Sequence, residues 1–306
     1  MRIGIIGAGR LGTALAVAMS REGHVPAAVY SKRHASSELL CERLGIGCVN
    51  SLLYAVASSD TIFIAVPDSQ IEDVVQNIID CTEDSDIRGR VFFHCSGAAD
   101  SSVLEPLRLK GGHTASLHPL QTFADRENGW KGLYNIYFGY EGDINAQGAA
   151  GEVVNALKGS MIHIGRDDKA LYHAAACILS NYTVALSWAA GEIFNKIGID
   201  SATGVKALMP LLEKTVKNIE DLGSMAALTG PVSRGDWGTV QRHIDAMQKS
   251  LPDISRIYRV LGELTLDMAV KRGDISPEAS RIMRGLLSDK TKGCMRCSDV
   301  EEKDGF

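Results

Sequence analysis

The chain has 306 residues, of which 45% are hydrophobic and 23% charged, a balance typical of a globular protein with a sizeable core. Its formal net charge of −5 offers no basic surface for nucleic acid, and no apolar run reaches the roughly 18 to 20 residues that a membrane span needs. We therefore expect a cytoplasmic protein with no nucleic-acid or membrane partner.

Seven cysteines lie at scattered positions, without the even spacing of a disulfide framework. Cys294 and Cys297 form the one CxxC pair. Structural zinc needs four ligands, and no second pair or nearby histidine completes the set. The surrounding residues 289–306 are polar and highly charged, so we predict a mobile tail there in preference to a metal or redox site, and no metal is expected elsewhere.

Apolar runs that end in glycine, proline or serine alternate with helical patterns through the first half of the chain. Gly23 is the expected C-cap of the first helix, and Ser69 and Glu72 have the spacing of a capping box. This alternation predicts an α/β fold with a Rossmann-like, doubly wound and mostly parallel sheet. Strands are expected at 2–9, 25–31, 61–67, 90–98, 114–119, 135–142 and 160–165, and helices at 10–23, 36–45, 51–59, 68–80 and 149–158.

The pattern becomes entirely helical after about residue 165, with Asp167 as the expected N-cap of a first long helix. We predict three parts: a Rossmann-like α/β domain at 1–165, an all-helical domain at 166–288, and the charged tail at 289–306. The helices are expected at 167–198, 201–223, 237–250, 252–273 and 276–289.

A G-x-G-x-x-G motif follows the first strand and opens the first helix, which is the context that a dinucleotide-binding loop requires. The first glycine permits a tight turn, the second lets the backbone approach a pyrophosphate, and the third lets helix and strand pack closely. The alternative is a glycine turn without a ligand. The expected cofactor contacts are Gly7, Ala8, Gly9, Arg10, Leu11 and Gly12.

The end of the second strand favours NADP over NAD. An NAD site usually has an acidic residue there for the ribose hydroxyl, whereas this chain has Ser31, Lys32 and Arg33, which suit a 2′-phosphate. The alternative is a solvated basic loop. Two further loops should line the cofactor crevice, one with Ala65, Val66 and Pro67 and the other with Ser96 and Gly97. Asp68, which follows the first of these loops, either lines the crevice as well or serves only as a helix cap.

A polar stripe runs along the first long helix of the second half, where Lys169, His173, Cys177 and Asn181 are spaced four apart. If this face meets a nicotinamide, Lys169 could bind a substrate carboxylate or carbonyl oxygen and His173 could transfer a proton. Asn181, with Ser180 beside it, could hold the cofactor amide or the substrate. The alternatives are a solvated Lys169 and a satisfied core amide at Asn181.

Two other stretches are candidates for substrate contact. Pro119 restricts His118 to extended backbone, so His118 should lie at a strand end near the cofactor, with Ser116 on the same strand; a satisfied strand-end histidine is the alternative. Thr229 and Arg234 lie in a loop rich in glycine and hydroxyl groups before a helix that Asp236 should cap, and could receive an anionic group; a structural ion pair of Arg234 is the alternative.

Six stretches carry a resemblance to a known family: "RIGIIGAGRLG", "AVPD", "FFHCSGA", "SLHPLQTF", "ILSNY" and "LTGPVSRGDWGTVQRH". Together they resemble the bacterial family that pairs a Rossmann-like domain with a DUF2520 domain, within the 6-phosphogluconate-dehydrogenase-like superfamily of ketopantoate and pyrroline-5-carboxylate reductases. The resemblance implies dimerisation through the helical domain and a link with pantothenate synthesis. "SLHPL" is similar to a prephenate dehydrogenase stretch whose histidine bonds the substrate hydroxyl, which implies that role for His118. Where ketopantoate reductases have an Asn four residues after a Lys, this chain has His173 after Lys169.

From these patterns we expect an NADPH-dependent reductase of a small carboxylate-bearing carbonyl or imine compound, with His118 and Asn181 near the reacting oxygen and with Arg234 or Lys169 on the carboxylate. Ketopantoate is the leading substrate by resemblance. A pyrroline-5-carboxylate reductase, an F420-dependent NADP reductase, and a non-catalytic NADP sensor are the alternatives. A homodimer is expected.

Overall fold

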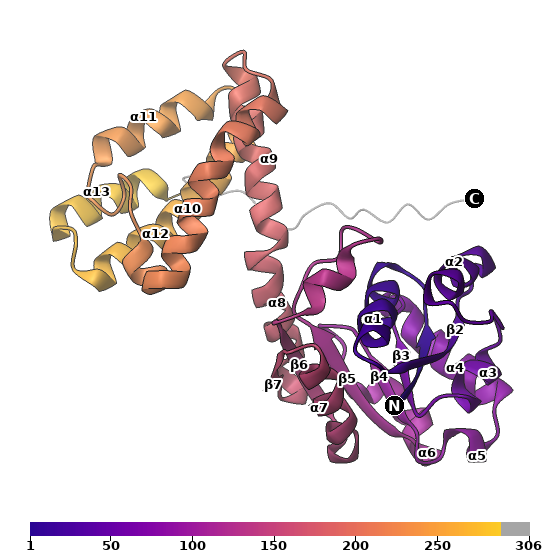
Figure 1. Cartoon of the computed structure of the whole chain (residues 1–306). Helices are drawn as coiled ribbons and strands as arrows, with labels where there is room; N and C mark the ends of the chain where they lie inside the picture. Colours follow the sequence, from indigo (N-terminus) through magenta and orange to yellow (C-terminus); the bar gives the residue numbers. More distant parts are fainter. Residues whose placement is uncertain (289–306) are drawn as a thin grey trace, which may run out of the picture. The chain divides into compact units, whose positions relative to one another are not determined.

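A computed structural model describes residues 1–288 of the chain. By packing, the chain divides into two compact units, one from Met1 to Thr183 and the other beginning at Val184. The first unit therefore includes helix α8, Lys169–Leu179, as well as the predicted Rossmann-like segment. Each unit is described by itself below (Figure 1).

The first unit is built on one seven-stranded sheet in the order β2-β1-β3-β4-β5-β6-β7. The first five strands in sequence are mutually parallel, β6 runs antiparallel to β5, and β7 runs parallel to β6. The carboxyl ends of the first five strands therefore share one edge of the sheet. This confirms the predicted mostly parallel sheet, with all seven strands at the predicted places: β1 Arg2–Ile6, β2 Val25–Tyr30, β3 Thr61–Ile64, β4 Val91–His94, β5 His113–Pro119, β6 Tyr137–Gly142 and β7 Ser160–His163.

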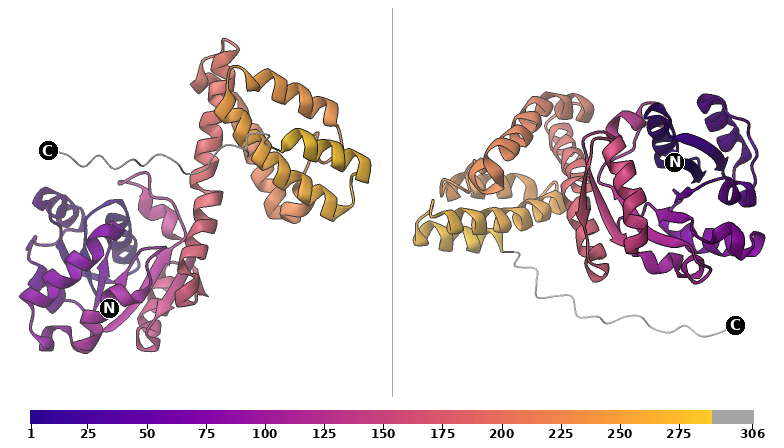
Figure 2. Two further views of the ribbon diagram at one scale, coloured as in Figure 1. Left: turned by 180° about the vertical axis from the view of Figure 1, so that it is seen from behind. Right: turned by 60° about the horizontal axis from the view of Figure 1, so that its bottom comes forward.

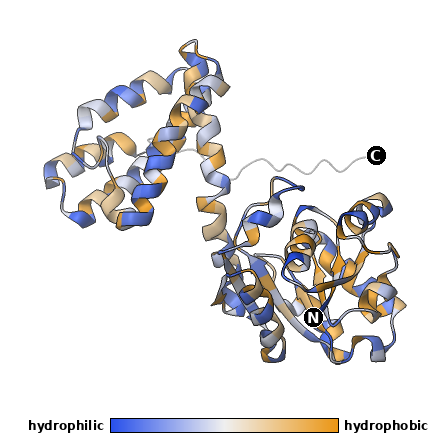
Figure 3. Cartoon of the chain, in the orientation of Figure 1, coloured by the Kyte–Doolittle hydropathy of each residue, from blue (hydrophilic) through white to orange (hydrophobic). Residues whose placement is uncertain are grey.

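Helices cover both faces of the sheet, and alternating strand residues supply two separate cores (Figures 1 and 2). In β4, Phe93 packs toward one face and Phe92 toward the other, and both are fully buried. The strands themselves are mostly apolar (Figure 3), as a sheet covered on both faces requires. The helices of the first face are α1 Arg10–Arg21, α2 His34–Leu44 and α7 Gln147–Ala156; those of the second are α3 Leu52–Ala57, α4 Ile71–Cys81, α5 Asp84–Ile87 and α6 Glu105–Leu109.

Helix ends account for most differences between prediction and structure. Gly23 adopts the left-handed conformation just past α1, as expected. The capping box of Ser69 and Glu72 is absent, because Asp68–Gln70 forms a 3-10 turn and α4 begins only at Ile71. Asp167 is likewise not an N-cap, because it lies inside the 3-10 turn Arg166–Asp168 that precedes α8.

The second unit is helical, as predicted, but the first predicted helix is interrupted. The stretch is divided at Ser180, a turn residue, into α8 and then α9, Asn181–Lys196, which crosses the division between units. Asp236 caps α11 by accepting a hydrogen bond from the Thr239 amide. Within residues 1–288, no helix combines the length and apolar character needed to cross a membrane. The remaining helices are α10 Ser201–Ala227, α11 Trp237–Gln248, α12 Pro252–Arg272 and α13 Pro277–Leu287.

Candidate functional site

The glycine loop between β1 and α1 has the geometry of a pyrophosphate cradle. Gly7 has a φ of +104°, and a Cβ there would lie 2.5 Å from the Ala65 carbonyl oxygen at the end of β3. A Cβ at Gly12 would overlap the Gly7 carbonyl oxygen, so α1 can approach β1 only through a glycine. Gly9, in contrast, is exposed and has no neighbouring heavy atom within 4 Å of its Cβ position among the described residues. Folding therefore requires Gly7 and Gly12, whereas Gly9 leaves open space.

The N-terminus of α1 suits an anion. Gly9 occupies the N-cap position without a side chain to accept from the helix amides, and the first turn contains no acidic residue. Uncapped amides and the positive end of the helix dipole both favour a phosphate at this point. Ala8 is buried beneath the loop, while Arg10 is exposed and Leu11 half-buried in the first turn, so all six predicted loop residues lie together.

The loop after β2 presents two cations to solvent. Lys32 and Arg33 are exposed, and neither has an ion-pair partner in the part of the chain that the structure describes. Asn50 holds the loop backbone: its Oδ1 accepts from the Ser31 amide at 2.9 Å, and its Nδ2 donates to the Ser31 carbonyl at 3.1 Å. The two cations are thus free to meet a 2′-phosphate. Asn50 was missed because no motif marks it.

Arg126 is a second residue that sequence reasoning missed. Its guanidinium donates to the carbonyl oxygens of Ala8, at 2.7 Å, and of Ser36, at 3.4 Å, and so joins the glycine loop to the start of α2. Arg43 in turn donates to the Arg126 carbonyl oxygen at 3.2 Å and fixes the segment on α2. More than a hundred residues separate Arg126 from Ala8, so only the fold reveals this contact.

The loops after β3 and β4 are connected by a hydrogen bond. Ser96 Oγ donates to Asp68 at 2.7 Å and accepts from the amides of Ala98 and Ala99. Asp68 therefore holds the β4 loop and does not act as the helix cap that was its alternative. Ala65 and Val66 are half-buried and Pro67 is exposed beside them, at the carboxyl edge of the sheet where the cofactor crevice was predicted.

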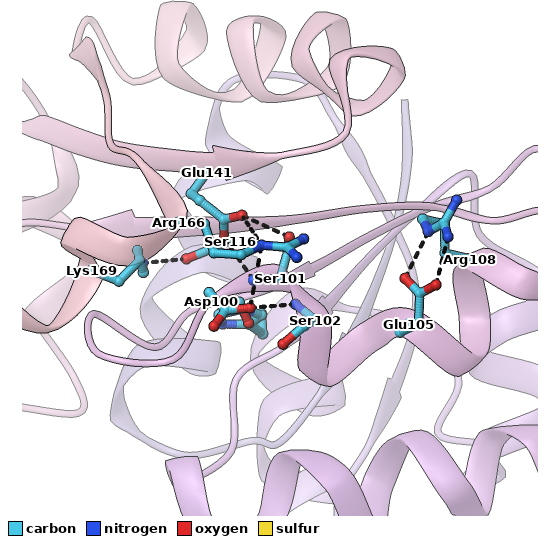
Figure 4. Close-up of polar contacts among 10 residues, drawn as sticks. Asp100, Ser101, Ser102, Glu105, Arg108, Ser116, Glu141, Arg166 and Lys169 are labelled. Carbon is cyan, nitrogen blue, oxygen red and sulfur yellow. Dashed lines mark hydrogen bonds and ion pairs between the residues drawn. The ribbon is translucent and has the colours of Figure 1, made fainter.

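Lys169 is buried, with 2% of its surface exposed. Its ammonium donates to Ser116 Oγ at 2.7 Å (Figure 4) and to the Ser96 carbonyl oxygen at 3.1 Å. Ser116 Oγ also donates to that Ser96 carbonyl, at 3.1 Å. Lys169 as a carboxylate ligand stays a prediction, and this burial does not favour it.

His118 and His173 meet at Gly97. A Cβ at Gly97 would overlap His173 Nδ1 and would lie 3.0 Å from both Cε1 and Nε2 of His118. The two imidazole rings are perpendicular, with centroids 5.9 Å apart.

His118 Nδ1 is hydrogen-bonded to the Tyr172 hydroxyl at 2.9 Å, and His173 Nε2 lies 3.5 Å from Cys177 Sγ. His173 Nδ1 is buried without a partner among residues 1–288. The structure thus brings His118, His173, Ser116 and Lys169 together, and adds Tyr172.

Burial keeps His118 and His94 neutral. Desolvation, reinforced by the Lys169 charge, lowers the pKa of His118 to about 4 and the pKa of His94 to about 4. Desolvation also lowers the pKa of Lys169 and raises the pKa of Tyr172. Near neutral pH the imidazoles of His118 and His94 are therefore uncharged, and the Tyr172 phenol keeps its proton.

An acidic network borders the cluster (Figure 4). Glu141 is buried and accepts from the amide and hydroxyl of Ser101 at 2.6 and 2.8 Å. Arg166 lies 3.7 Å from Glu141 and 3.8 Å from Asp100. These contacts tie β6 to the turn after β4. Asp100 also accepts a hydrogen bond, at 2.7 Å from the Ser102 amide, so both carboxylates are held in place.

The remaining predicted substrate residues are exposed or half-buried. Asn181 is exposed at the start of α9, so the prediction that its side-chain amide is buried in the protein core is wrong. Ser180 is half-buried at the interruption between α8 and α9. Thr229 and Arg234 are exposed residues of the second unit, and their part in a substrate site stays a prediction. Cys294 and Cys297 lie outside the described residues, within which no cluster of metal-ligating side chains occurs.

The sheet, the glycine loop and the edge cluster define a Rossmann-type dinucleotide-binding fold followed by a helical domain. Residues 1–119 match the family model described as a Rossmann-like domain, and residues 136–265 match DUF2520, a domain of unknown function. The chain is therefore a member of the family that joins these two domains. No curated protein sequence matches it significantly.

Solved structures share the fold across most of the chain. A Bacteroides fragilis protein assigned as an NADP oxidoreductase is 22% identical with a TM-score of 0.70, covering 87% of this chain and 98% of its own. A Thermotoga maritima protein is 24% identical with a TM-score of 0.68, covering 89% and 99%. An imine reductase from Myxococcus stipitatus, in complex with NADP+, is 19% identical with a TM-score of 0.60, covering 94% and 100%. At these identities the likeness establishes the fold.

Proposed function

We propose that this protein is an NADPH-dependent reductase of a small carbonyl compound that carries a carboxylate, with 2-dehydropantoate (ketopantoate) as the leading candidate. One observation carries the proposal: the glycine loop after β1 and the His118 cluster after β4 and β5 share the carboxyl edge of the same parallel strands. Ligands of open α/β sheets bind at this edge, where the strand order reverses.

The residues present fit NADPH. Gly9 leaves the space that a pyrophosphate needs, the α1 amides are uncapped, and Lys32 and Arg33 have no other ionic partner within residues 1–288. NADPH would supply a hydride to the substrate carbon. Fold relatives bound to NADP+ and NADPH support this cofactor.

Within this proposal, His118 donates a hydrogen bond to the substrate oxygen as that oxygen gains negative charge. Removing one such donor typically costs roughly 3 kcal/mol of transition-state stabilisation. Ser96 and Gly97 form the floor of the site beside it. Lys169 fixes the ends of β4 and β5 and adds a positive field. The substrate-binding roles of Asn181, Ser180, His173, Thr229 and Arg234 stay predictions.

Reduction of an imine is the second candidate, because two fold relatives are named as an imine reductase and a reductive aminase. A C=N substrate must be a cationic iminium ion before it accepts hydride. The buried Lys169 charge, which already disfavours protonation of His118, would disfavour a second cation nearby and would stabilise an alkoxide and a carboxylate. The electrostatics therefore favour a carbonyl over 1-pyrroline-5-carboxylate.

The test is NADPH oxidation against a panel of ketopantoate, other 2-keto acids, cyclic imines, ketone and amine mixtures, and oxidised F420. We expect turnover of a keto acid, abolished in His118→Asn. Turnover of imines alone would replace the proposal with the second candidate, and turnover of F420 with an F420-dependent NADP reductase. Tight NADPH binding without turnover of any compound would indicate an NADP sensor. Full kcat in His118→Asn would refute the role of His118.

We also propose a homodimer. Large apolar side chains are exposed on α8 and α9, and a contiguous apolar surface on a globular protein marks an interface. Analytical ultracentrifugation should give twice the chain mass of 32.9 kDa. Leu179→Glu should yield a monomer, whereas Leu109→Glu on α6, an equally exposed leucine, should not. A monomeric wild-type protein would end this proposal. The exposed residues are Leu171, Ile178, Leu179, Tyr182, Val184 and Trp188.

A further inference from the structure

Tyr172 reaches His118 across a neighbouring strand. His118 in β5 is paired with Gly139 in β6, and Tyr172 projects from α8 over that pair. A Cβ at Gly139 would lie 2.6 Å from the Tyr172 hydroxyl oxygen, so a glycine there is what allows the phenol to approach. The hydroxyl then lies 2.9 Å from His118 Nδ1, with the two rings perpendicular and 5.6 Å apart.

The direction of this hydrogen bond follows from the groups around the phenol. Among residues 1–288, His118 Nδ1 is the one acceptor that is hydrogen-bonded to the Tyr172 hydroxyl. The phenol proton therefore has an acceptor within the protein only when Nδ1 carries no proton. In a neutral imidazole the single proton must then be on Nε2. That nitrogen faces Gly97, at the carboxyl edge of the sheet.

We propose that Tyr172 is a positioning residue that locks His118 as the neutral tautomer with its proton on Nε2, so that Nε2–H is presented to the substrate oxygen above Gly97. The opposite tautomer would place an unprotonated Nε2 there, which cannot donate. The catalytic consequence rests on the proposed reductase function, whereas the tautomer itself does not.

His173 does not compete for this role. Its Nε2 is paired with Cys177 Sγ, and its Nδ1 has no partner in the described part of the chain, so no group fixes its proton. The Lys169 ammonium lies over the Tyr172 ring, 5.7 Å from its centroid, and its hydrogen bonds within residues 1–288 go to Ser96 and Ser116. The Tyr172 hydroxyl is therefore the one group among residues 1–288 that is hydrogen-bonded to the His118 ring.

The tautomer can be read from the imidazole ¹⁵N resonances of histidine-labelled full-length protein at pH 7, with His118 assigned by its loss in His118→Gln. We expect Nε2 protonated and Nδ1 unprotonated in the wild type. Tyr172→Phe, which keeps the ring, should populate both tautomers, and so should Gly139→Ala, which displaces the hydroxyl. Tyr137→Phe is the control, because the exposed Tyr137 hydroxyl has no hydrogen-bond partner within residues 1–288.

On a substrate from the panel, Tyr172→Phe should lower kcat at least tenfold while the Kd for NADPH stays at the wild-type value. A proton on Nδ1 in the wild type, or an unchanged tautomer in both Tyr172→Phe and Gly139→Ala, would overturn the inference. The NMR measurement tests the tautomer of His118 even if the wild type reduces no compound of the panel. Failure of the reductase proposal can therefore be told apart from failure of this inference.

Discussion

The ammonium of Lys169 lies 2.7 Å from Ser116 Oγ and 3.1 Å from the carbonyl oxygen of Ser96, so one side chain of α8 joins the ends of β4 and β5. Ser116 Oγ also donates to the same carbonyl. Each of these two oxygens thus keeps a partner when the ammonium is removed. Burial of the charge itself is unfavourable, as the lowered pKa of Lys169 indicates.

Lys169→Met should therefore fold at least as stably as the wild type at pH 7, while losing activity. The folded pKa of Lys169 lies below 10.5, so the unfolded chain binds the extra proton and wild-type stability rises with pH up to that value. Urea unfolding at several pH values should show this rise in the wild type and not in Lys169→Met. A loss of more than about 2 kcal/mol at pH 7 would mean that the serine contacts outweigh desolvation.

Gly9→Ala and Gly12→Ala should separate cofactor binding from folding. Gly9 has open space around its Cβ position, so Gly9→Ala should keep the wild-type melting temperature and lose NADPH affinity at least tenfold. At Gly12 a methyl group would meet the Gly7 carbonyl oxygen, so Gly12→Ala should fail to fold or melt much earlier. Differential scanning fluorimetry and NADPH titration provide both readouts, and unchanged affinity in Gly9→Ala would contradict the cofactor assignment.

Gly97→Ala should disrupt the histidine pair. The added methyl would overlap His173 and crowd the His118 ring, so kcat should fall at least tenfold with little change in the Kd for NADPH. Gly148→Ala in α7 is the matched control, since no described atom lies within 4 Å of its Cβ position. That control should gain roughly 0.5 to 1 kcal/mol of stability, because alanine is the better helix former. Wild-type kcat in Gly97→Ala would place the reaction elsewhere.

Arg126→Ala should weaken NADPH binding about tenfold, the effect of losing roughly 1.4 kcal/mol, because it releases the glycine loop from the start of α2. Lys131→Ala removes a cation of the same segment that lies over the Trp130 ring and makes no bond to the loop, and should bind NADPH normally. Equal Kd values for the two variants would show that the Ala8 contact does not shape the cofactor loop.

Stability should fall steeply in mild acid. His94 is fully buried, with Nδ1 accepting from the Ser96 amide and Nε2 bonded to the Asp100 carbonyl, and its folded pKa is about 4. The unfolded chain binds a proton already below pH 6.5, so the free energy of unfolding decreases as pH falls from 6.5 to 4, by roughly 3 kcal/mol from this residue. Urea unfolding at several pH values in this range should show that the free energy of unfolding depends less steeply on pH in His94→Asn than in the wild type. An equal pH dependence in the two proteins would refute the lowered pKa of His94.

Local chemistry was enough to predict the sheet and the glycine loop. The strands are apolar runs of the required length, and Gly12 is required by an overlap with the Gly7 carbonyl oxygen, five residues earlier. Pro119 likewise fixed the backbone of His118 locally. Two predicted helix caps were wrong, because Ser69 and Asp167 each lie inside a 3-10 turn that precedes the helix.

The surroundings of the predicted side chains, in contrast, depend on contacts between distant segments. A spacing of four placed Lys169 and His173 on one helical face, but it could not show that this face packs against the ends of β4 and β5, which buries the ammonium. Tyr172 and Arg126 carry no motif, and each acts on a residue far away in the chain, His118 and Ala8. Such contacts depend on how strands are ordered and where a glycine leaves room, and no local pattern contains that information.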